Sequence, residues 1–156
     1  MALRQISEVI DGHTGNARTV LEYGMTTKRI VDGAKRPGFT AGDWAPLAAL
    51  VAVEEFERVG TFKEVMTWEE YVGFLTGWAP SAEWACLFRR ITETPDRIFL
   101  ELEERSTVGG HESVANSVSV YEFDGTGKIR HIDVYLQMAP PPPEMLKGYE
   151  GIDLTR

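Results

Sequence analysis

The stretch ESVANSVSVYEFDGTGKIRHIDVYLQM, from Glu112 to Met138, decides the fold of this 156-residue chain. In two segments of it, 112–123 and 128–138, apolar and polar side chains alternate, the pattern of a strand with one buried face. Between them lies the loop Asp-Gly-Thr-Gly, with glycine where a hairpin turn needs positive φ. The stretch therefore predicts an antiparallel hairpin.

The alternation also indicates which side chains of this hairpin face the core. We expect the apolar set to pack on helices and the polar set to lie outside. The apolar set is Val114, Val118 and Val120 in one strand and Ile132, Val134 and Leu136 in the other. The opposite set is Ser113, Ser117, Ser119 and Tyr121 in one strand and His131, Asp133, Tyr135 and Gln137 in the other.

The chain before the hairpin predicts two further strands, 84–92 and 97–107, separated by the turn sequence Glu-Thr-Pro-Asp. An acid-rich strand is expected within 53–59, where every second side chain has to be solvated. Together these segments predict one curved antiparallel sheet.

Three helices are expected ahead of these strands. Apolar spacing predicts a helix over 16–32, and Asp43 is placed to cap a second one. A third begins at Trp68, because Thr67 and Glu70 form a capping box, and ends near Gly77 and Pro80. The predicted fold class is α+β, a cone-shaped curved antiparallel sheet with three helices covering its concave face.

Composition limits the function classes. Twenty-four acidic against sixteen basic residues give a net charge of −8, which opposes binding to nucleic acid or to an acidic membrane surface. Cys86 is the single cysteine, and no apolar run of about 18 residues or secretory leader is present. We expect a cytoplasmic protein with one domain, 1–139, and a proline-rich tail, 140–156.

Three segments carry a resemblance to a known family: GDWAPLAAL, MTWEEYVGFLTGW and DGTGKIRHIDVYLQ. With the order of elements, they resemble the nuclear transport factor 2-like superfamily over roughly 39–138, and within it the SnoaL-like and scytalone dehydratase-like branch. The resemblance implies a deep pocket between helices and sheet. Asn116 matches an asparagine that binds substrate in the dehydratases. Phe39 and Phe56 replace that family's tyrosines, Thr40 replaces its aspartate, and its acid-base histidines have no counterpart before Gly109.

Candidate catalytic residues are Asn116, His131 and Asp133. His131 and Asp133 share a strand face at a spacing that lets a carboxylate orient an imidazole. The alternative is that their row is a solvated or dimer-facing outer surface. Asn116 interrupts the apolar face of its strand, so we expect a buried amide that needs a partner, either a ligand or else the backbone or water.

Aromatic side chains exceed what the packing of a small domain requires, and aromatic walls suit a flat cyclic ligand. The candidate ligand-binding residues are Trp44, Phe56, Tyr71, Trp84, Val134 and Leu136. Alternating glutamates, such as Glu101 and Glu103, could supply a general base or simply form a solvated strand face. No spacing suggests a metal site, no phosphate loop is present, and no cofactor is expected.

The expected function is that of a cofactor-free lyase, isomerase or cyclase that moves a proton on a small apolar cyclic metabolite. The alternative is a protein that binds such a ligand unchanged, or a subunit of a complex, on the same scaffold. The polar face of the final hairpin also predicts a homodimer that meets through this sheet surface.

Overall fold

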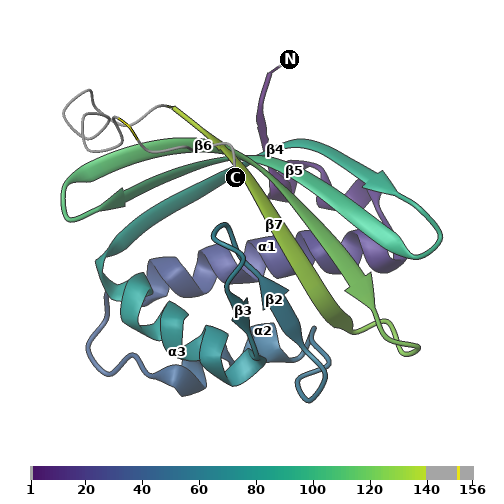
Figure 1. Cartoon of the computed structure of the whole chain (residues 1–156), viewed down its shortest axis with the longest axis horizontal. Helices are drawn as coiled ribbons and strands as arrows, with labels where there is room; N and C mark the ends of the chain where they lie inside the picture. The colour runs from purple at the N-terminus through teal and green to yellow at the C-terminus, as the bar shows by residue number, and fades with distance from the viewer. Residues whose placement is uncertain (1, 140–150, 152–156) are drawn as a thin grey trace.

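The computed structural model describes residues 2–139 and 151. These residues form an α+β fold in which three α-helices lie on one side of a seven-stranded, mostly antiparallel sheet (Figure 1). The helices are α1 (Gly15–Gly33), α2 (Ala45–Ala48) and α3 (Trp68–Trp78). The strands are β1 (Arg4–Gln5), β2 (Glu57–Val59), β3 (Val65–Met66), β4 (Ala82–Glu93), β5 (Arg97–Val108), β6 (His111–Phe123) and β7 (Ile129–Met138).

The strand order is β1-β4-β5-β6-β7-β2-β3. Strands β4 to β7 pair antiparallel with their neighbours in sequence, and β2 adds to β7 in parallel. The four long strands expected from the sequence are thus confirmed. The turn after β6 is also as expected, with Gly127 at φ 87°.

The capping box that begins α3 forms as expected. The Thr67 hydroxyl accepts a hydrogen bond from the Glu70 amide at 3.3 Å, and the Glu70 carboxylate accepts one from the Thr67 amide at 3.1 Å. The expectation for Asp43 was wrong. A 3₁₀ turn over Ala41–Trp44 precedes α2, so Thr40 is the N-cap and Asp43 accepts the Thr40 amide at 2.7 Å.

The acid-rich strand is shorter than expected, because β2 starts only at Glu57 and a turn occupies the residues before Phe56. Strands β1 and β3 were not expected from the sequence. Each has two residues, too few to show a period of two.

The face assignment for β6 was wrong. Ser117 and Tyr121 are buried, at 2% and 5% exposure, whereas Val114 is 52% exposed. The register explains this difference, because Ser119 pairs with Val134, and Val134 faces the helices as expected. Directly opposed residues share a face, so the serines lie inside and the valines outside.

The end of α1 is tied to the rest of the fold by Lys35. Its ammonium donates to the carbonyl of Val31 at 2.6 Å, to that of Ala79 at 2.9 Å and to that of Ala82. These bonds join α1 to the turn after α3 and to the start of β4. None of the helices formed by the described residues is long and apolar enough to cross a bilayer. The proline-rich tail, apart from Gly151, lies outside the described residues.

Candidate active site

An interior cavity of about 90 Å³ lies between α1, α3 and the inner face of the sheet. Its walls combine aliphatic side chains with an unusual number of polar groups. The polar side chains include Tyr23, Arg58, Tyr71, Glu104, Ser119 and Tyr121. Such a mixture of apolar surface and converging polar groups is typical of a ligand site.

Five elements supply these side chains. Tyr23 comes from α1 and Tyr71 from α3, so the two helices place hydroxyls above the sheet. Tyr121 lies on β6 opposite Ile132 of β7, and the Tyr23 and Tyr121 rings meet edge to face at 5.9 Å. Arg58 of β2 also pairs with Ile132, which puts the guanidinium on the inner face.

Burial keeps the tyrosine hydroxyls protonated. It is the largest cause of a raised pKa at Tyr23, Tyr71 and Tyr121 alike. The positive charge of Arg58 opposes that rise in pKa at each of the three hydroxyls, while Glu104 adds to it at Tyr71 and Tyr121. The hydroxyls are therefore neutral hydrogen-bond donors lying in the field of one cation and one anion.

Glu104 is oriented by Trp84. The indole Nε1 of Trp84 donates to Glu104 Oε1 at 2.9 Å. Glu104 follows Leu100 and Leu102 along the inner face of β5, and all three line the cavity. The hydrogen bond from Trp84 restricts the positions that the Glu104 carboxylate can take in the cavity.

Trp84 also lines a second, open hollow. This groove, of about 980 Å³, lies at the end of α1 and of strands β4 to β6, with Lys28 and Ser106 among its lining residues. Trp84 therefore lines both the interior cavity and the groove.

The size of the cavity limits what it can hold as it stands. An apolar cavity of about 150 Å³ is known to accept benzene. The interior cavity, at about 90 Å³, is smaller than that. It has room for a small polar group with a few carbon atoms, and a complete ring needs the groove as well.

Three of the predicted ligand-binding residues, Tyr71, Trp84 and Val134, line this cavity. The other three do not. Trp44 and Phe56 are buried at 1% and 4% exposure in the core. Leu136 lines a shallow hollow next to Asn116 and Tyr135.

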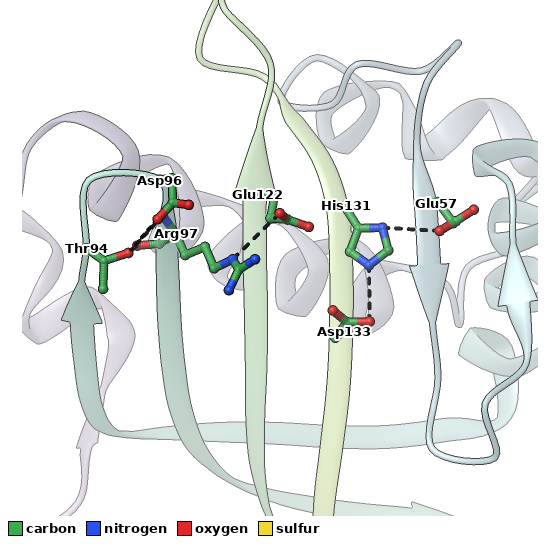
Figure 2. Close-up of polar contacts among 7 residues, drawn as sticks. All are labelled: Glu57, Thr94, Asp96, Arg97, Glu122, His131 and Asp133. Carbon is green, nitrogen blue, oxygen red and sulfur yellow. Dashed lines mark hydrogen bonds and ion pairs between the residues drawn. The ribbon is translucent and has the colours of Figure 1, made fainter.

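The predicted catalytic residues lie on the outer face of the sheet. His131 Nε2 lies 3.1 Å from Asp133 Oδ1, and His131 Nδ1 lies 3.3 Å from Glu57 Oε1 (Figure 2). The predicted spacing of His131 and Asp133 is thus realised, and Glu57 of β2 is a further partner. Because His131 neighbours Ile132 along β7, its side chain points away from the cavity.

Asn116 is not the buried amide that was expected. It shares the outer face with Val114 and Val118, where Arg89 Nη1 donates to its Oδ1 at 2.6 Å. Its Nδ2 donates to Gln137 Oε1 at 3.4 Å. The protein itself satisfies this side chain. A catalytic role for Asn116, His131 and Asp133 stays a prediction, and it would require a site on the outer face.

The glutamates considered as a pair, Glu101 and Glu103, also lie on the outer face. Arg90 Nη2 donates to Glu101 at 2.9 Å, and Arg105 pairs with Glu103 at 2.7 Å. Among the described residues, no cluster of three or more histidine, cysteine, aspartate and glutamate side chains could hold a metal ion.

The polar residues of the cavity that were missed at the sequence level are Tyr23, Thr27, Arg58, Glu104, Ser119 and Tyr121. A signal existed for Glu104, because it continues the alternation of Leu100 and Leu102 as a carboxylate in an apolar row. Arg58 lies in a segment rich in glutamate, which was interpreted as a solvated strand face, so it was not considered as a site residue. Tyr121 was assigned to the wrong face.

The fold is similar to that of solved nuclear transport factor 2-like proteins, so the fold that the resemblance implied is confirmed. Similar structures include a nuclear transport factor 2-like protein of unknown function from Burkholderia pseudomallei, with 16% identity, a TM-score of 0.63, and coverage of 86% of this chain and 97% of that one.

Two similar structures have a named activity. A Δ5-3-ketosteroid isomerase from Mycobacterium sp. has 16% identity and a TM-score of 0.56, over 78% of this chain and 98% of that one. A LEH-like epoxide hydrolase from M. tuberculosis has 14% identity and a TM-score of 0.53, over 72% and 84%. No protein-family model and no curated protein sequence matches the chain. At these identities the likeness establishes the fold, and the chemistry has to be argued from the cavity.

Proposed function

We propose that this protein catalyses a cofactor-free proton transfer on a small carbonyl compound, with the reacting group in the interior cavity. The observation that carries the proposal is the presence of one oriented carboxylate, Glu104, and three neutral tyrosine hydroxyls around one small buried space. Isomerase activity in a protein of similar fold is consistent with this choice.

In the proposed reaction, the substrate has a carbon–carbon double bond beside the carbon next to its carbonyl, and Glu104 removes a proton from that carbon. The electron pair of the broken C–H bond moves into the carbonyl group and gives a dienolate. Tyrosine hydroxyls donate hydrogen bonds to the dienolate oxygen, which stabilises it. Glu104 then returns the proton to the far carbon of the original double bond, and the double bond moves next to the carbonyl, so the reaction is an isomerisation and consumes no other reactant.

The apolar, cyclic part of the substrate is proposed to lie in the groove outside Trp84. The interior cavity is smaller than one benzene-sized space, whereas the groove has about 980 Å³. An indole at the junction offers a flat apolar surface to a ring. Binding of a cyclic substrate then requires Trp84 to move while its neighbour Glu104 stays in reach of the carbonyl end.

The proposal is tested by hydrogen–deuterium exchange in D₂O, followed by NMR on butanone, cyclohexanone and 4-oxopentanoate. We expect the protein to accelerate exchange next to the carbonyl of at least one of them. Glu104→Gln should lower the rate by about 10²-fold or more, the usual contribution of a general base. Glu101→Gln, a matched change on the outer face of the same strand, should leave the rate unchanged. Equal rates for the two variants would refute the role of Glu104.

A second function is favoured by the small size of the cavity. A space of about 90 Å³ suits a protein that holds one end of a ligand without changing it. In that case, compounds that raise the melting temperature would be recovered unaltered and without deuterium, and Glu104→Gln would change affinity alone.

A further inference from the structure

We infer that the interior cavity recognises a carboxylate group of its ligand, with Arg58 as the charged partner and the Tyr23 hydroxyl as a second donor. This inference rests on the proposal that the cavity is the ligand site, and it names the chemical class of that ligand. It concerns binding, so it can be tested without any catalytic assay.

Arg58 is a cation that faces the cavity without a carboxylate partner. Its guanidinium carbon lies 4.6 Å from the centre of the Tyr71 ring, over the ring face. Within residues 2–139, none of the ion pairs involves Arg58. Glu64 Oε1 and Arg58 Nη1 both lie beside Gly60, but no ion pair joins them, and the Glu64 carboxylate accepts a hydrogen bond from the Phe62 amide at 2.8 Å.

The surplus of acidic residues makes this arrangement informative. The chain has 24 acidic and 16 basic side chains, so carboxylates are abundant. Several other arginines of the sheet, such as Arg90 and Arg105, are paired with glutamates on the outer face. A half-buried arginine that is left unpaired beside a cavity is complementary to an anion supplied by a ligand, and a guanidinium binds a carboxylate through two parallel hydrogen bonds.

Tyr23 supplies an independent observation. Its side chain is 6% exposed, and its hydroxyl lines the cavity but forms no hydrogen bond of normal geometry with any described residue, although the Tyr71 hydroxyl is close enough to influence its pKa. A buried hydroxyl without a partner is unfavourable, and a ligand oxygen in the cavity would satisfy it. The positive charge of Arg58 lowers the pKa of the Tyr23 hydroxyl, and both residues line the interior cavity.

Glu104 determines which end of the cavity the anion occupies. Its carboxylate, held by Trp84 next to the groove, repels a second carboxylate at that position. The ligand carboxylate is therefore placed at Arg58, and the chain of the ligand passes Glu104 and Trp84 toward the groove. The volume of about 90 Å³ fits a carboxylate with a few carbons.

The test compares hexanoate with hexanamide, which have the same length and differ in charge. Isothermal titration at pH 7 should show that the protein binds hexanoate about tenfold or more tightly than hexanamide. Arg58→Gln should bring the two affinities within about twofold of each other. Arg89→Gln, which removes an outer-face arginine, should keep the wild-type preference.

Two further variants protect the test against a folding defect in Arg58→Gln. Arg58→Lys keeps the charge but loses the paired hydrogen bonds, so it should retain part of the preference. Tyr23→Phe should weaken hexanoate binding several-fold and should leave hexanamide binding nearer to its original value. Equal binding of both compounds by the wild-type protein, a preference that survives in Arg58→Gln, or no binding of either compound would overturn the inference.

These outcomes separate this inference from the proposed function. A protein that binds hexanoate through Arg58 but exchanges no ketone protons would be a carboxylate-binding protein, and only the catalytic proposal would fail. A protein that exchanges ketone protons through Glu104 but does not distinguish the two probes would retain its proposed function and overturn the inference.

Discussion

Replacing Tyr23 by phenylalanine should stabilise the free protein while it weakens ligand binding. The hydroxyl is buried and forms no hydrogen bond of normal geometry with any described residue, although the Tyr71 hydroxyl is close enough to influence its pKa. An unsatisfied buried polar group costs about 1–3 kcal/mol, so its removal should raise the free energy of unfolding by about 1 kcal/mol. For a domain of this size that corresponds to a rise in melting temperature of about 2–4 °C.

Ser117→Ala is the matched control for this substitution. The Ser117 hydroxyl is also buried without a partner among the described residues, but it does not line the cavity. Its removal should stabilise the protein by up to about 1 kcal/mol and leave hexanoate affinity unchanged. Urea unfolding followed by circular dichroism, with the slope checked for constancy, gives both free energies.

The opposite sign would refute the reasoning. If Tyr23→Phe lowered the free energy of unfolding by about 1 kcal/mol or more, the hydroxyl would be well hydrogen-bonded in the free protein. The Tyr23 hydroxyl would then not be a free donor for a ligand oxygen. If Tyr23→Phe were more stable but bound hexanoate with unchanged affinity, the Tyr23 hydroxyl would not contribute to ligand binding.

Three other predictions concern the pH response, the core and the assembly. Burial raises the pKa of Tyr23, Tyr71 and Tyr121, and raises that of the Cys86 thiol from 9.0 to about 12, so the unfolded chain loses these protons first as the pH rises. The free energy of unfolding should fall by about 1.4 kcal/mol per pH unit for each such group, above about pH 9 for Cys86 and above about pH 10 for the tyrosines, and Cys86→Val should make the fall between about pH 9 and 10 shallower; a flat profile would contradict the burial of these groups. Lys35→Met removes hydrogen bonds to three carbonyls and should cost about 2 kcal/mol in urea unfolding, whereas a loss below about 0.5 kcal/mol would show that water replaces them. Tyr135 is 61% exposed on the outer face, and Tyr135→Glu should convert the predicted homodimer to a monomer in light scattering; an unchanged dimer mass would exclude this face as the interface.

Local signals in the sequence predicted most of the elements. The bounds of α1 follow from apolar spacing, and the start of α3 follows from the reciprocal hydrogen bonds of Thr67 and Glu70. Both depend on residues that are close in sequence, which is why they could be read directly. The two-residue strands β1 and β3 carry no such signal and depend on their partners.

The faces of the sheet were harder to predict, because alternation defines two faces without saying which is inside. Valine suggested the core face of β6, yet the pairing of Ser117 with Leu136 puts serine there. Pairing across the hairpin, combined with the correct assignment of β7, would have resolved this point. The error also moved Tyr121 out of the predicted site and Asn116 into it.

The composition of the cavity depends on contacts between distant segments. Tyr23, Arg58 and Glu104 are far apart in the sequence, and only the packing of α1 on the sheet and the pairing of β2 with β7 bring them to one space. Tyr71, Trp84 and Val134 were predicted because each is an apolar or aromatic residue with a regular spacing. A polar residue facing inward breaks such a pattern, so patterns alone do not find it.

The most direct test of the account is whether hexanoate reaches the interior cavity, and NMR can show it with two reporters on opposite faces. The indole N–H of Trp84, bonded to Glu104 at the boundary of the cavity, reports the inner face. The imidazole of His131, held between Glu57 and Asp133, reports the outer face. During a hexanoate titration, we expect the Trp84 indole signal, assigned with Trp84→Phe, to shift while the His131 ring signals stay in place. Shifts at His131 with an unchanged Trp84 indole signal would contradict the account and place the ligand on the outer face.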